Sequence, residues 1–167
     1  MSNKRHIISL LLQNEVGALA RVAGLFSNRG YNIESLNVAP TDDPTVSRIT
    51  LVTTGTDAVL AQIVSQSLKL VDVVNVDDLT RDAHIERELL LLKLKPSPGQ
   101  VGSLRGLLVS AGAKALSDDA EGMVVEVVDS EARLNEFISA VSSHAELLEV
   151  ARSGALAVLR GGETLRN

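Results

Sequence analysis

The segment Asn14–Gly17 has the residue types and the spacing to bind a small anion. It lies between an apolar run typical of a buried strand and an amphipathic pattern typical of a helix. In that setting the backbone N–H groups of Gly17, Ala18 and Leu19 point out of the helix N-terminus and favour a negative charge. Gly17 allows close approach to the backbone, and the Asn14 amide offers both a donor and an acceptor. A carboxylate or a phosphate fits such a loop.

Asn32 is a second candidate, because it starts an alternating apolar segment directly after Gly30 and Tyr31. Both asparagines also have ordinary structural interpretations. Asn14 can cap the helix of a plain strand-to-helix turn, and Asn32 can simply be tolerated in a turn. The residues alone leave these alternatives open.

Other site chemistries have little support in the sequence. The chain has no cysteine, which excludes disulfides, iron–sulfur clusters, thiolate zinc sites and cysteine nucleophiles. The three histidines are far apart and lack metal-ligand spacing, and the paired aspartates, such as Asp42 and Asp43, are typical of solvated turns. No nucleophile elbow, Walker loop or Gly-x-Gly-x-x-Gly motif is present. We therefore expect neither a catalytic residue nor a metal in this chain.

Composition narrows the partners further. The 167 residues carry a net charge of −5, and aromatic residues make up only 2%. This argues against binding of a phosphate backbone and against base stacking on exposed rings. The N-terminus is polar and the apolar run at 7–12 is too short for a signal or membrane segment, so we expect a cytoplasmic protein.

The elements that must position the candidate residues follow an order that occurs twice. In the first half, 5–12, 32–38, 46–54 and 73–79 read as strands. One helix has Leu19, Val22, Ala23 and Phe26 on one face, and a second, capped by Thr56, has Leu60, Val64, Leu68 and Val71. In the second half the expected strands are 85–94, 123–128, 147–151 and 155–159, with helices at 101–111 and 134–141.

These patterns predict an α+β fold with two ferredoxin-like βαββαβ domains, residues 1–80 and 84–167. Both helices of such a unit cover one face of its sheet. The other face would be bare and aliphatic, which favours a homodimer.

Particular stretches of sequence resemble a known family. Asn14–Leu19 followed by Arg21-Val22 resembles the opening of an ACT domain. Gly30–Leu36, followed by Ala39–Thr45, resembles more specifically the small regulatory subunit of acetolactate synthase (acetohydroxyacid synthase). Ala83–Leu89 and Glu149–Gly154 resemble the second domain of the same family.

The resemblance implies a non-catalytic subunit of branched-chain amino-acid (isoleucine and valine) biosynthesis. It implies association with a large catalytic subunit that uses thiamine diphosphate, Mg²⁺ and FAD, with no cofactor in this chain. The small subunit would activate that enzyme and confer allosteric feedback inhibition by valine. In this family valine binds where two ACT domains meet, so residues 1–80 would serve effector binding and dimerisation.

Carried onto this sequence, the effector-binding residues are Asn14, Gly17, Ala18 and Leu19 of one chain, facing Asn32 and Ile33 of the other. The ligand carboxylate would bind the N–H groups near Gly17, and the Asn14 oxygen would accept from the ammonium. Leu11, Leu19 and Ile33 would surround the isopropyl group.

Two residues that border this site depart from the family pattern. Val16 stands where relatives commonly have Ser or Pro, and Ala20 where many have Ser. The strength of valine inhibition therefore has to be measured.

Two other functions remain as alternatives. One is a stand-alone ACT amino-acid sensor that controls a different enzyme or a transcription factor. The other is an acylphosphatase-like enzyme, which needs an arginine in or beside the anion loop, whereas Arg21 lies one turn into the helix.

Overall fold

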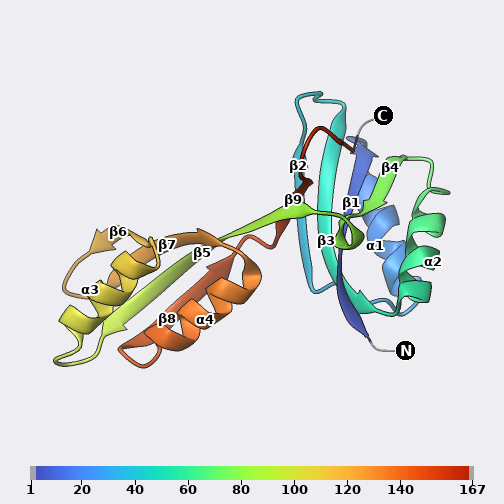
Figure 1. The fold of residues 1–167 in the computed structure, drawn as a ribbon. Helices are drawn as coiled ribbons and strands as arrows, with labels where there is room; N and C mark the ends of the chain where they lie inside the picture. Colours follow the sequence, from blue (N-terminus) through green and yellow to red (C-terminus); the bar gives the residue numbers. More distant parts are fainter. Residues whose placement is uncertain (1–2, 166–167) are drawn as a thin grey trace. The chain divides into compact units, whose positions relative to one another are not determined.

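The computed structural model describes residues 3–165 as two compact units (Figure 1). The first unit contains the chain up to Glu86 together with the segment that starts at Gly154, and the second is Arg87–Ser153. The elements of the first unit are β1 (Lys4–Gln13), α1 (Ala18–Asn28), β2 (Ser35–Pro40), β3 (Val46–Gly55), α2 (Asp57–Ser67), β4 (Val73–Asp78), a 3-10 turn at Leu79–Arg81 and β9 (Leu156–Leu159). Those of the second are α3 (Val101–Ser110), β6 (Lys114–Asp118), β7 (Met123–Asp129), α4 (Glu131–Val141) and β8 (Ala145–Arg152), with β5 (His84–Pro96) beginning in the first unit.

The first unit is an antiparallel sheet with strand order β2-β3-β1-β4 and two helices. Because side chains alternate along a strand, one face of β1 carries Ile8, Leu10 and Leu12. These residues form the core with buried side chains of α1 and α2, including Phe26 and Leu60. This is the predicted βαββαβ arrangement, and it places the β1–α1 loop at the end of a central strand.

The C-terminal segment covers part of the opposite face of this sheet, contrary to the expectation of a bare face. Ala155 and Ala157 pack with Ile7 and Val52 in a second apolar cluster. Arg48 donates from Nη2 to the carbonyl of Ala157 at 2.9 Å. The sequence pattern did not reveal this contact because small alanines at 155 and 157 carry no marked amphipathic signal.

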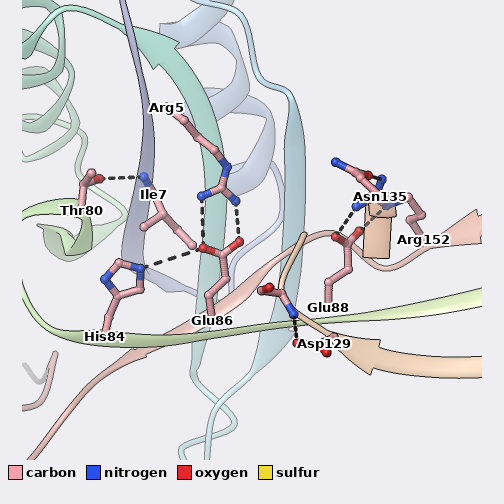
Figure 2. A network of polar contacts seen from close by, with 10 residues as sticks. Arg5, Ile7, Thr80, His84, Glu86, Glu88, Asp129, Asn135 and Arg152 are labelled. Carbon is pink, nitrogen blue, oxygen red and sulfur yellow. Dashed lines mark hydrogen bonds and ion pairs between the residues drawn. The ribbon is translucent and has the colours of Figure 1, made fainter. Parts of the chain in front are cut away.

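Polar contacts tie the start of β5 to the same unit (Figure 2). Arg5 donates two hydrogen bonds to Glu86, at 2.5 and 3.1 Å, and the backbone N–H of Ile7 donates to Thr80 at 2.9 Å. The structure thus assigns residues 84–86 to the first unit, and it also assigns the segment from residue 154 onward to that unit. The sequence pattern placed all of 84–167 in a second domain.

The second unit repeats the topology with strand order β6-β7-β5-β8. Leu90, Leu92 and Leu94 of β5 face the buried side of α3 and α4, where Leu104 and Phe137 pack. The sequence pattern does not reveal β6, because all five of its residues are exposed and it carries no buried periodic face. No helix in residues 3–165 is long and apolar enough to cross a membrane.

Local predictions in the first unit were confirmed in part. Thr56 caps α2 by accepting the backbone N–H of Val59 at 3.3 Å, as predicted. Leu68 and Val71 lie beyond the end of α2 and are exposed, so the predicted stripe was too long. Leu19 is 40% exposed, because α1 buries Ala18, Val22 and Phe26 instead. The second strand begins three residues after Asn32, at Ser35.

Candidate functional site

The β1–α1 loop presents unpaired backbone donors at the N-terminus of α1. Gly17 is the N-cap residue and has φ 85°, a left-handed conformation that favours glycine. Its carbonyl accepts the first helical bond, from the N–H of Arg21 at 3.0 Å, and the N–H of Ala18 donates to Glu15 at 3.2 Å. Within the described residues the N–H groups of Leu19 and Ala20 have no acceptor. The N–H of Gly17 also has no acceptor there, so two of the three predicted donors, Gly17 and Leu19, are unpaired, whereas Ala18 bonds Glu15.

The orientation of the Asn14 side chain is fixed by the β2–β3 turn. Its Nδ2 donates to the carbonyl of Pro44 at 3.1 Å, and its backbone N–H donates to the carbonyl of Thr45 at 2.8 Å. Since the carbonyl of Pro44 can only accept, the amide nitrogen of Asn14 must face it. The Oδ1 atom of this exposed side chain is left to accept a hydrogen bond from a ligand ammonium.

The turn that holds Asn14 is itself braced by Asp43. One carboxylate oxygen of Asp43 accepts from the backbone N–H of Thr45 at 2.8 Å and from its hydroxyl at 2.7 Å. The side chain of Thr41 accepts from the N–H of Asp43 at 3.1 Å. The bonds from Thr45 hold the pKa of Asp43 below its ordinary value. Asp43, Pro44 and Thr45 thus form a hydrogen-bonded turn that contacts Asn14.

Arg21 and Asp72 form a two-pronged ion pair beside the same loop. Nε and Nη2 of Arg21 donate to the two carboxylate oxygens of Asp72 at 2.5 and 2.8 Å. The side chain of Asp72 is only 7% exposed, whereas that of Arg21 is 46% exposed. The hydrogen bonds from Arg21 lower the pKa of Asp72, and the same bonds raise the pKa of Arg21.

Asn32 and Ile33 lie at the other end of the same sheet. The carbonyl of Asn32 accepts from the hydroxyl of Thr53 at 2.5 Å, and Thr53 is paired with His6 near the start of β1. Asn14 follows the end of β1, eight residues after His6, and extended chain rises by about 3.3 Å per residue. The two asparagines of one chain are thus separated by roughly 26 Å along the strand, and a single chain does not bring them together.

The predicted aliphatic pocket is not assembled within one chain. Ile33 packs against the helix-covered core, and Leu19 lies on the surface of α1. Leu11 alternates with Leu10 and Leu12 and so points to the opposite face of the sheet, where it lines a cavity of about 740 Å³ with Arg48 and residues of the β2–β3 turn. Leu11 is therefore removed from the predicted pocket. In residues 3–165 no group of three or more His, Asp or Glu side chains has the arrangement of a metal site.

Two family models match the chain, one over each half. Residues 8–75 match the model described as "AHAS small subunit-like ACT domain", and residues 87–161 match "Small subunit of acetolactate synthase". The chain belongs to the acetolactate synthase small-subunit family. As a member of it, the protein is a small, regulatory subunit of acetolactate synthase with an N-terminal ACT domain and a role in branched-chain amino-acid biosynthesis.

Relatives support this assignment over almost the whole chain. The Escherichia coli acetolactate synthase isozyme 3 small subunit is 45% identical over 163 residues, which cover 97% of this chain and 99% of the relative. The Haemophilus influenzae acetolactate synthase small subunit is 44% identical, covering 96% and 99%. The crystal structure of the acetolactate synthase small subunit from Thermotoga maritima superimposes with a TM-score of 0.85 at 30% identity and covers 96% of this chain and 99% of that one.

Sequence reasoning missed the residues that support the site. The position of Arg21, one turn into the helix, served only as a reason against phosphatase chemistry, and the sequence pattern assigned no role to the Asp72 side chain. The Ala39–Thr45 motif was noticed as a mark of the family, but its contact with Asn14 depends on a pairing between β1 and β3 that no local pattern reveals.

Proposed function

We propose that this chain associates with the large catalytic subunit of acetolactate synthase, activates it, and makes it sensitive to valine through a site shared by two copies of the ACT domain. The observation that carries the proposal is the separation of the two half-sites. Asn14 and Gly17 lie at one end of the sheet, and Asn32 and Ile33 lie at the other. Thiamine diphosphate, Mg²⁺ and FAD would belong to the partner subunit.

Antiparallel pairing of two β2 strands would bring the half-sites together. β2 is one of the two edge strands of its sheet, and its side chains Leu36 and Val38 are each more than one third exposed. In an antiparallel pair the start of one strand lies opposite the end of the other. Asn32 precedes the start of β2, whereas its end leads into the turn that holds Asn14. A two-fold homodimer would therefore contain two identical sites.

The chemistry of the loop suits an α-amino acid. The free N–H groups of Leu19 and Ala20 and the positive end of the α1 dipole would bind the carboxylate. The Oδ1 atom of Asn14 would accept from the ammonium. The exposed Leu19 of one chain and the half-buried Ile33 of the other would contact the isopropyl group. One methylene changes such binding by about 1–3 kcal/mol, so leucine and isoleucine should compete weakly.

Feedback would then be a linkage between the dimer interface and the enzyme. Valine that touches both chains favours the interface geometry in which its contacts are best. It can shift the holoenzyme only by its difference in affinity for the active and the inhibited states. Activation and inhibition therefore correspond to two geometries of the same complex.

The experiment that tests the shared site mixes two defective variants. Asn14→Ala and Asn32→Ala are each expected to lose valine binding in calorimetry, because each damages both sites of its homodimer. A mixed dimer carries one doubly damaged site and one intact site. Co-expression of the two variants should therefore restore about one quarter of the wild-type number of sites per chain, given random pairing.

The two parts of the proposal fail in different ways. If the co-expressed mixture binds no more valine than either variant alone, the site is not shared between chains. If the wild-type chain does not stimulate acetolactate formation by the large subunit, the partner assignment is overturned. If it stimulates but millimolar valine does not inhibit, the partner is kept and the effector is not valine.

A further inference from the structure

We infer that Arg21 and Asp72 are a positioning pair for the β1–α1 loop, residues 14–17, which we call the effector loop. Their ion pair fixes the backbone of Val16 and Gly17 and thereby sets the affinity for the ligand carboxylate. This inference rests on the proposed function, because it assigns two further residues to the same site. The inference extends the proposed function, since neither Arg21 nor Asp72 is one of the proposed ligand contacts.

The guanidinium of Arg21 lies directly against the loop. A Cβ atom at Gly17 would lie 2.9 Å from Nη1 of Arg21, closer than a carbon normally approaches, and 3.7 Å from Cζ, an ordinary contact. Nη2 lies 3.5 Å from the carbonyl oxygen of Val16. The loop therefore packs against the guanidinium, and a larger residue at position 17 would require the Arg21 side chain to shift.

Asp72 holds the guanidinium at that place. Its carboxylate is almost fully buried and accepts both prongs of Arg21, which defines the plane of the guanidinium as well as its position. The backbone carbonyl of Asp72 accepts the N–H of Gln13 at 2.8 Å, so this residue is also bonded to the last residue of β1. Asp72, which directly precedes β4, thus connects the end of β1 with the first turn of α1.

The two ends of the loop are consequently held by different anchors. Asn14 is held by the β2–β3 turn, and Gly17 is held by Arg21 and Asp72. Between these anchors the loop has little freedom, so its N–H donors keep their direction when no ligand is bound. Because a preorganised site avoids the entropic cost of ordering on binding, loss of one anchor should weaken the ligand.

The test is a double-mutant cycle of Arg21→Gln and Asp72→Asn, read by calorimetric titration of the full chain with valine. Each single variant is expected to raise the Kd for valine by at least about fivefold. The Kd of the double variant should not exceed that of the single variant with the higher Kd, because the two residues act as one unit. Arg21→Lys keeps the charge without the planar fork and should recover only part of the affinity.

A matched control separates positioning from general stability. Arg152 and Glu88 form the same kind of ion pair in the second unit, at 2.9 and 2.7 Å, with side chains that are 31% and 5% exposed (Figure 2). Glu88→Gln should lower the Tm at least as much as Asp72→Asn and leave the Kd for valine unchanged. An equal loss of valine affinity in Glu88→Gln would show that both variants act through stability alone.

The outcomes distinguish this inference from the proposed function. If the wild-type chain does not bind valine, the proposed function fails first. If the wild-type chain binds valine and Asp72→Asn binds it equally well while unfolding at a lower temperature, the ion pair is structural only and the positioning role is overturned. Additive losses in the double variant would likewise exclude a coupled pair.

Discussion

Replacing Gly17 by alanine is the sharpest single perturbation of the effector loop. The residue has φ 85°, and a left-handed conformation costs an ordinary L-residue roughly 1–2 kcal/mol. The new Cβ would also lie 2.9 Å from Nη1 of Arg21, so the guanidinium has to move away from Asp72 or the loop has to rise. We expect a loss of about 1–2 kcal/mol in the free energy of unfolding and a several-fold higher Kd for valine.

Gly112→Ala is the matched control. Gly112 follows α3 in the second unit, has φ 66°, and has no heavy atom within 4 Å of the Cβ position. The substitution therefore introduces the same backbone strain without a steric conflict. In urea unfolding followed by circular dichroism, Gly17→Ala should lose at least as much stability as Gly112→Ala, because it adds the contact with Arg21 to the same backbone strain. Only Gly17→Ala should weaken valine binding in calorimetry.

Two results would refute this reasoning. If Gly17→Ala binds valine as tightly as the wild type, the loop does not hold the ligand. If Gly112→Ala weakens valine binding as much as Gly17→Ala, the effect comes from general destabilisation and carries no information about the site. A stability loss in Gly17→Ala well below that in Gly112→Ala would contradict the conflict with Arg21.

Two more predictions concern the groups that brace the loop. Asp43→Ala removes the acceptor for the backbone N–H and the hydroxyl of Thr45, so Asn14 should lose its fixed orientation and the Kd for valine should rise by a few-fold. Asp43→Asn should restore most of the affinity, and Asp42→Ala should leave the Kd unchanged. A normal Kd in Asp43→Ala would contradict the bracing role. The carboxyl of Asp72 has a lower pKa in the folded than in the unfolded chain, so its stabilising contribution is present above the unfolded value, about 4, and is lost as the pH falls through the folded value. Urea midpoints between pH 5 and pH 3 should consequently fall less steeply in Asp72→Asn than in the wild type, and equal slopes would exclude this contribution.

The sequence predicted the parts of the fold that depend on local periodicity. The apolar run of β1, the alternation in β3 and the i, i+3, i+4 pattern around Val22 and Phe26 reflect burial against one core. The β6 strand was missed because none of its residues is buried, and Leu19 was misplaced because helix periodicity tolerates a shift of the buried face by one residue. Local sequence patterns reflect which side chains are buried, so an exposed element such as β6 leaves little pattern to detect.

The candidate site shows a different limit. Asn14, Gly17 and Asn32 were found from their residue types and from the family resemblance, although two of them lie at opposite ends of one sheet. Pro44 lies about 30 residues from Asn14, and Asp72 lies about 50 residues from Arg21, through which it supports Gly17. No spacing rule links these segments, because their proximity follows from the register of β1 with β3 and β4.

Under the proposed function, this register would also let the β1–α1 loop respond to a second chain. The turn that orients Asn14 continues directly from β2, the edge strand that we propose to meet its counterpart in the dimer. A shift of that strand would move the carbonyls of Pro44 and Thr45, and with them the amide of Asn14. Binding of valine would in turn hold the turn, and through it the strand, in one position. Effector affinity and interface geometry are then linked through two hydrogen bonds, which is the reciprocity that feedback control requires.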